Sequence, residues 1–122
     1  VYDLVMTHKL DADDFFIHRV QEQCAARGLN FFLVEPLWVE EFQTKLARDH
    51  VWAWALLNLH SEHHLPDDPF TRLVRLAVAR HVAVVDEPDT ALAAFDKARL
   101  HPLLAGAGIN VPFSVIVPAS EA

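Results

Sequence analysis

Four polar residues near the middle of the chain are of types that could hold a metal ion. His60, Glu62, His63 and His64 follow the apolar run 51–59. Imidazole and carboxylate groups are zinc ligands, and structural zinc sites take four ligands in tetrahedral geometry. Adjacent histidines on one loop seldom supply three such ligands, and no complete zinc motif accompanies them. We therefore predict a solvated loop without a metal, and keep His60 and Glu62 as candidate substrate contacts.

A second candidate site follows the first apolar run of the chain. His8 and Lys9 come directly after the strand-like segment 2–7, and their side chains could hold an anionic group. A surface turn that leads into the first helix explains the same two residues equally well. Both interpretations stay open, and His8 and Lys9 complete the set of candidate substrate contacts.

Motifs that would identify a nucleotide site or a covalent catalyst do not occur in the sequence. No Gly-x-Gly-x-x-Gly fingerprint follows the first predicted strand, and no P-loop is present. The single cysteine, Cys24, lies on the apolar stripe of the first predicted helix, which favours a core position. A phospho-receiver needs an acceptor aspartate after the third strand, where the sequence reads Leu59-His60-Ser61. We predict no catalytic residue in this chain.

The elements that must position these residues alternate in type along the chain. Strands are predicted at 2–7, 30–35, 51–59, 82–86 and 113–117. Apolar spacings of three and four predict helices between Asp14 and Gly28, over 37–47, from Pro69 through Val78, over 88–94 and over 96–105. Such alternation predicts an α/β fold, a mostly parallel sheet with helices on both faces.

We expect residues 1–88 to form a Rossmann-like three-layer domain with a four-stranded parallel sheet in the order 2-1-3-4. Residues 89–122 would add connecting helices and a final strand that lies off this sheet or pairs with a neighbouring molecule. Ligands on such sheets bind beyond the carboxyl ends of the strands, where all four candidate contacts fall. The predicted core consists of Leu4, Val5, Phe16, Val20, Phe32, Leu33, Leu73, Val74, Ala77, Val84 and Val85.

The charge balance restricts the classes of partner. Seventeen acidic residues against ten Lys and Arg give a formal net charge of −7. A nucleic-acid surface needs a basic stripe, and an anionic membrane attracts the same charge. No apolar run reaches the length of about 18 residues that a membrane span needs. A single cysteine allows no internal disulfide, which fits a reducing compartment. We expect no nucleic-acid or membrane partner, and a cytoplasmic location.

The last third of the chain carries short motifs in a recognisable order. Residues 84–88 read Val-Val-Asp-Glu-Pro, residues 95–97 read Phe-Asp-Lys, and residues 108–112 read Gly-Ile-Asn-Val-Pro. This order resembles the segment with which ATP-grasp enzymes leave their first domain. D-alanine–D-alanine ligases, glutathione synthetases and ribosomal-protein glutamate ligases are similar here: a strand ends in an Asp-Pro or Asn-Pro turn, Asp-Lys opens a helix, and Gly-Ile/Val-x-x-Pro leads into the ATP-binding lobes.

The resemblance implies a pre-ATP-grasp domain, the N-terminal substrate-side part of an ATP-dependent carboxylate–amine ligase, without activity of its own. It implies ATP and Mg²⁺ for a full-length protein, in lobes of the same polypeptide beyond this chain. Lys97 alone is carried over as a phosphate contact, and a solvated lysine at a helix start is the equal alternative. His101 stands where D-alanine ligases have a second lysine, which leaves the subfamily open.

A different class of function stays open beside the ligase. The chain could be a free-standing Rossmann-like binding or dimerisation module, with a homodimer as its assembly. A reading frame that continues well beyond Ala122 would favour the ligase, and a stop near Ala122 would favour the module.

Overall fold

A computed structural model describes residues 1–8, 14–60 and 65–118 of the chain. In chain order its elements are β1 (Tyr2–Thr7), α1 (Asp14–Ala26), β2 (Phe31–Val34), α2 (Val39–Ala47), β3 (Ala53–Asn58), α3 (Pro69–Ala79), β4 (Ala83–Val85), α4 (Pro88–Phe95) and α5 (Lys97–Gly106). Contacts divide the chain into two units, Val1–Pro88 and Asp89–Ala122. No helix among the described residues is both long and apolar enough to cross a membrane.

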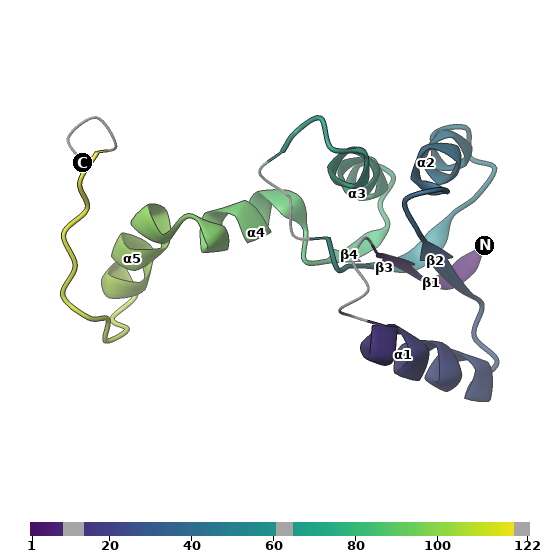
Figure 1. Ribbon diagram of the computed structural model, residues 1–122, viewed down its shortest axis with the longest axis horizontal. Helices are drawn as coiled ribbons and strands as arrows, with labels where there is room; N and C mark the ends of the chain where they lie inside the picture. Colours follow the sequence, from purple (N-terminus) through teal and green to yellow (C-terminus); the bar gives the residue numbers. More distant parts are fainter. Residues whose placement is uncertain (9–13, 61–64, 119–122) are drawn as a thin grey trace. The chain divides into compact units, whose positions relative to one another are not determined.

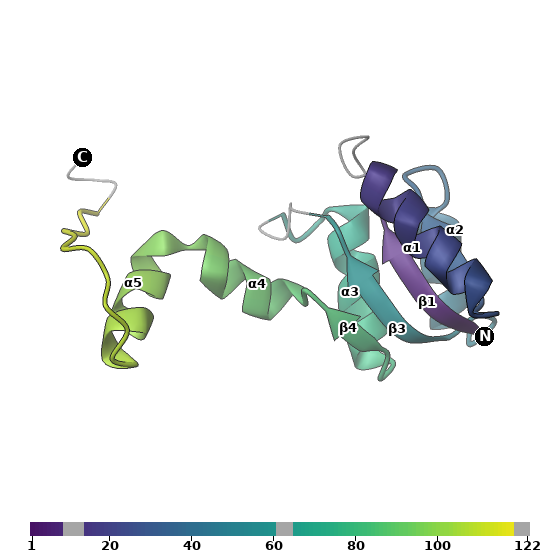
Figure 2. The same cartoon turned by 90° about the horizontal axis from the view of Figure 1, so that it is seen from below.

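The four strands form one parallel sheet in the order β2-β1-β3-β4 (Figure 1). Helices α2 and α3 cover one face of this sheet, and α1 lies on the other face (Figures 1 and 2). The predicted fold class and strand order are therefore confirmed, as a Rossmann-like α/β arrangement. The central strands β1 and β3 are apolar along most of their length because helices cover the middle of the sheet on both faces.

Helix α3 shows how the sequence sets the layer above the sheet. The Asp68 carboxylate accepts hydrogen bonds from the amides of Phe70 (3.0 Å) and Thr71 (3.4 Å), and Pro69 occupies the first turn. This is the preferred start of a helix, because the cap pairs amides that have no partner inside the helix. The face that follows buries Phe70, Leu73, Val74 and Ala77 against the sheet.

The predicted core is only partly correct. Val5, Leu73, Val74 and Ala77 are buried, whereas Leu4, Val20, Phe32, Leu33 and Val84 are half-buried. The prediction is wrong for Phe16 and Val85, whose side chains have exposed fractions of 47% and 59%. Helix α1 instead turns Ile17 and Cys24 inward, so its contact stripe begins one residue later than predicted. Val85 ends the short edge strand β4, which has a neighbouring strand on one side only.

The second unit has its own helices but no strand among its described residues. Asp96 caps α5, and the helix continues through Pro102. Residues 113–117, predicted as a strand, form no strand pairing, and Phe113 is 93% exposed. The described chain offers this segment no neighbouring strand, and its pairing with another molecule or lobe stays a prediction.

Candidate functional site

The sheet has one point where chain connections leave in opposite directions. From β1 the chain proceeds to β2 on one side, and from β3 it proceeds to β4 on the other. Parallel α/β sheets bind ligands at such a switch point, in the crevice beyond the carboxyl ends of the two strands. In this chain those ends are Thr7-His8 on β1 and Asn58-Leu59-His60 on β3.

Thr7 and Asn58 form a buried polar pair that fastens the two strand ends together. The Thr7 hydroxyl donates to Asn58 Oδ1 (2.7 Å) and accepts from the amide of Leu59 (3.1 Å). Asn58 Oδ1 also accepts from the His60 amide (3.2 Å), and Asn58 Nδ2 donates to the carbonyl of Asp86 (3.2 Å). These bonds tie the carboxyl ends of β1, β3 and β4 to one another. They set the direction in which the chain leaves β3.

His60 is held by this turn on one side and by helix α3 on the other. Its Nε2 lies 2.8 Å from Oδ2 of Asp68, and both side chains are more than nine-tenths buried. Its ring also packs against Phe70, with ring centroids 5.0 Å apart. The prediction of a solvated loop is therefore wrong at His60, because the helix cap that starts α3 also binds the imidazole.

His8 occupies the corresponding place after β1. Its amide donates to the carbonyl of Val34 (3.0 Å), and its side chain is 8% exposed. Its Nε2 lies 3.5 Å from Oδ1 of Asp14, the first residue of α1. The surface-turn interpretation is thus wrong for the His8 side chain. Each of the two central strands ends in a buried histidine that faces an aspartate at the start of the next helix.

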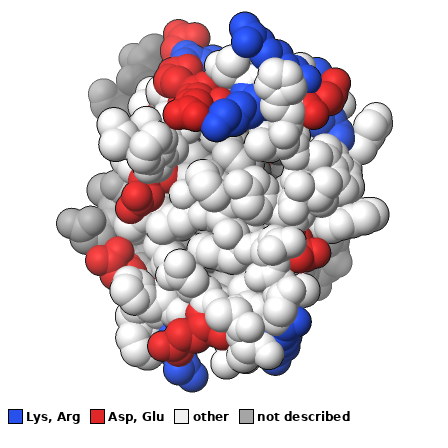
Figure 3. All heavy atoms as spheres, turned by 90° about the vertical axis from the view of Figure 1, so that its right-hand side faces the viewer, with Lys and Arg blue, Asp and Glu red and all other residues white. Residues whose placement is uncertain are grey.

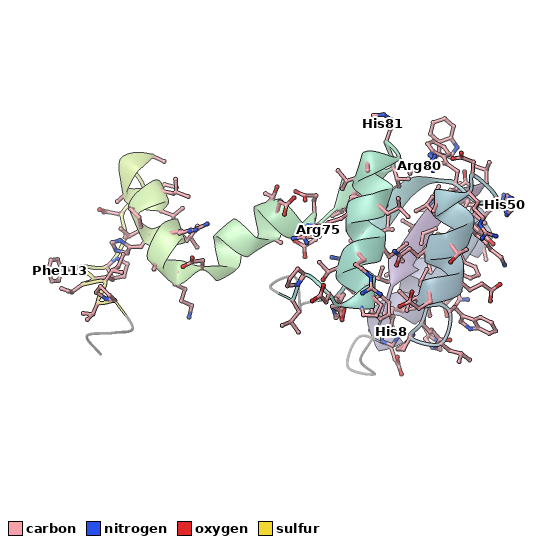
Figure 4. All side chains as sticks on the ribbon, turned by 90° about the horizontal axis from the view of Figure 1, so that it is seen from above. His8, His50, Arg75, Arg80, His81 and Phe113 are labelled. Carbon is pink, nitrogen blue, oxygen red and sulfur yellow. The ribbon has the colours of Figure 1, made fainter. Side chains whose placement is uncertain are left out.

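The structure brings two of the predicted contacts together at the carboxyl ends of the two central strands. His8 and His60 follow Thr7 and Asn58, which are paired neighbours in the β1–β3 register. Lys9 and Glu62 lie outside the described residues. Figure 4 labels His8 together with His50, an exposed histidine that comes before β3 and hence belongs to the amino ends of the strands.

Lys97, the predicted nucleotide contact, belongs to the second unit. It is the first residue of α5, is exposed, and lines a hollow of about 510 Å³ with His101 and parts of 111–117. Among the described residues, no group of three His, Cys, Asp or Glu side chains could hold a metal ion. The donors among the described residues do not amount to a nucleotide and Mg²⁺ site.

The sequence did not reveal Thr7 and Asn58 as part of the site, nor that Asp68 pairs with His60 besides capping α3. The only signal in the sequence was that a polar residue ends an apolar run, Leu-Val-Met in β1 and Ala-Trp-Ala-Leu-Leu in β3. Buried imidazole and hydroxyl groups can each donate and accept hydrogen bonds, which suits a small polar ligand.

Comparison with protein-family models found no match, and comparisons with curated proteins and with solved structures found none either. The structure identifies the fold as an α/β domain with a four-stranded parallel sheet.

Proposed function

We propose that this chain is the substrate-side domain of an ATP-dependent carboxylate–amine ligase, and that its share of the substrate site lies at the carboxyl ends of β1 and β3. The observation that carries the proposal is the pair of buried histidines, His8 and His60, at the ends of the two central strands. Histidine is a residue type that often binds or orients polar groups, and both lie where parallel α/β sheets bind ligands.

Each histidine would act by orienting part of the substrate. The Asp68 carboxylate fixes the ring of His60, and Asp14 lies beside the ring of His8. The described backbone amides that follow β1 and β3 already donate within the chain, so the imidazole N–H groups would be the donors to the substrate. A substrate carboxylate suits such donors, and an amino acid or short peptide is the expected substrate class.

The ligase part of the proposal rests on the resemblance of residues 84–112, and local geometry supports it. Strand β4 ends at Val85, and Asp86 follows with a left-handed φ of 66°, so the chain turns sharply before α4. Asp96 then caps α5, with its carboxylate accepting from the amides of Ala98 (3.1 Å) and Arg99 (3.3 Å). Lys97 stands exposed at the first position of that helix. The order of strand, turn and Asp-Lys helix start is the one that the resemblance implies.

Isothermal titration calorimetry on the chain tests whether it holds part of the substrate site and no nucleotide site. We expect weak binding of small amino acids such as D-alanine or L-glutamate, and no affinity for Mg-ATP below the millimolar range. One exposed charge contact at Lys97 contributes about 0–1 kcal/mol, whereas even 1 mM affinity requires about 4 kcal/mol. Micromolar binding of Mg-ATP would contradict the proposal, because it would require a complete nucleotide site in this chain.

A further inference from the structure

At the carboxyl end of β1, the imidazole of His8 is buried without a close partner among the described residues. Its side chain is 8% exposed, and its Nε2 has no hydrogen bond to any described residue. Oδ1 of Asp14 lies 3.5 Å away, beyond the usual distance of about 2.9 Å for a hydrogen bond from nitrogen to oxygen. By contrast, Nε2 of His60 lies 2.8 Å from Oδ2 of Asp68. Because a buried polar atom without a partner is costly, we expect a further group to pair with His8.

The first turn of α1 lies beside this nitrogen. Asp14, whose Oδ1 is 3.5 Å from Nε2 of His8, is the first residue of that 13-residue helix. The first amides of a helix have no partner inside the helix, and the positive end of the helix dipole favours a negative charge. A buried imidazole at such a helix start can donate its N–H to the same negative group. The place next to His8 therefore favours an oxyanion.

The Asp14 carboxylate shows which oxyanion suits this place. It is the chain's own carboxylate next to His8, and it belongs to a side chain that is 57% exposed. The backbone of His8 is held, because its amide donates to the carbonyl of Val34 at the end of β2. The exposed Asp14 side chain can turn into solvent without any change in the strands. A carboxylate of a ligand could then take its place beside the imidazole.

Other cations of the first unit are less suited to a carboxylate ligand, because an acid lies closer to them. Nζ of Lys45 lies 2.5 Å from Oε1 of Glu41, and this hydrogen bond raises the pKa of Lys45. Nη1 of Arg80 lies 2.6 Å from Oδ1 of Asp49. Figure 3 shows the side of the molecule with β2, where Lys and Arg side chains lie next to Asp and Glu side chains around an uncharged middle. A carboxylate would break such a contact at Lys45 or Arg80, whereas at His8 it would supply a hydrogen bond.

We propose that His8 and the first turn of α1 bind the carboxylate of the substrate, and that Asp14 is a built-in competitor that leaves His8 when the substrate enters. The inference rests on the proposed function for the substrate class, an amino acid or short peptide. It gives the two histidines different tasks, since His8 binds the carboxylate while His60 stays paired with Asp68. Two carboxylates repel each other beside one imidazole, so Asp14 lowers the affinity for the substrate.

Long-range ¹H–¹⁵N NMR spectra, which report the imidazole nitrogens, test the proposal on the unaltered chain. D-alanine and sodium acetate should shift the Nε2 signal of His8, whereas D-alaninamide, which lacks the carboxylate, and sodium chloride at the same ionic strength should not. An equal response to D-alanine and D-alaninamide overturns the proposal, and so does a response to sodium phosphate without one to acetate.

The two ligands also separate this inference from the proposed function. If D-alanine binds at the ends of β1 and β3 but leaves the Nε2 signal of His8 unchanged, the inference is overturned and the proposed function stands. If acetate shifts that signal but D-alanine and L-glutamate do not bind, the carboxylate subsite is supported and the proposed function is contradicted. If acetate has no effect on the signal, the subsite is overturned.

A matched pair of charge-removing variants tests the competitor. Asp14→Asn removes the competing carboxylate and should tighten acetate binding by about fivefold, because two like charges about 4 Å apart repel each other even in water. Asp67→Asn makes the same change of charge at an exposed position before α3 and should leave the affinity unchanged. Equal effects of the two substitutions would overturn the role of Asp14.

Variants of His8 test the donor itself. His8→Leu should weaken acetate binding by about tenfold or more, since it removes a charge-assisted hydrogen bond. His8→Gln keeps an N–H donor and should restore most of the affinity. Circular dichroism checks that both variants fold. Unchanged affinity in a folded His8→Leu would overturn the proposal, and the Asp14→Asn result decides the matter if His8→Leu does not fold.

Discussion

Removing the Asn58 side chain should destabilise the first unit strongly, because it is the centre of the bonds that join three strand ends. Asn58→Ala leaves the Thr7 hydroxyl and the His60 amide without their acceptor, and both residues are buried. A buried polar group without a partner costs about 1–3 kcal/mol. Water can reach the third partner, the carbonyl of the exposed Asp86. We expect a loss of about 3 kcal/mol in the free energy of unfolding, in the lower half of the range of about 2–6 kcal/mol for two such groups.

Urea unfolding followed by tryptophan fluorescence measures this loss. For a domain of this size it corresponds to a melting temperature lower by about 12–24 °C. Asn30→Ala is the matched control, because Asn30 is exposed and its substitution should change stability by no more than about 0.5 kcal/mol. Thr7→Val keeps the shape of the side chain and removes one hydroxyl, so it should cost about 1–2 kcal/mol. A loss below about 1 kcal/mol in Asn58→Ala would refute the reasoning.

Three further perturbations test other parts of the structure. Asp68→Ala removes both the cap of α3 and the partner of His60, so the free energy of unfolding should fall by about 2 kcal/mol. Urea unfolding measures this loss, and the control variant Asp67→Ala, at an exposed site, should not show it. Phe32→Ala removes a half-buried ring that packs against the rings of Tyr2 and Phe42. Calorimetric melting should show a loss of about 3 kcal/mol in the free energy of unfolding. A loss below about 1 kcal/mol would show that Phe32 does not contribute to the core. Lys97→Ala should change unfolding stability by no more than about 0.5 kcal/mol, since the side chain is exposed, and a larger loss would indicate a structural role.

The sheet could be predicted because its strands carry their signal locally. Short apolar runs alternate with segments of helical spacing, and a parallel sheet follows from that order. The signal for the start of α3 was also local, since Asp68 and Pro69 stand next to each other at the positions where a helix begins. Residues 113–117 carry the same apolar signal as the strands of the sheet, and they pair with none of them. A run of apolar residues does not say whether a neighbouring strand is available.

The site was only half predictable because its bonds join distant parts of the chain. Thr7 and Asn58 lie 51 positions apart, and only the strand register brings them together. The side of α1 that faces the sheet was also ambiguous, because Phe16 and Ile17 both begin an apolar stripe. Position after a strand predicted His8 and His60 as contacts, but their burial depends on aspartates of the following helices.

The most direct test of the proposed site is a two-dimensional ¹⁵N NMR titration of the chain with D-alanine and L-glutamate. We predict that the amide signals of His8, Leu59 and His60 shift together as ligand is added. His8→Ala should weaken this response, and His50→Ala, at the opposite ends of the strands, should not. Absence of any shift at these amides, or shifts confined to other parts of the chain, would contradict a substrate site at the carboxyl ends of β1 and β3.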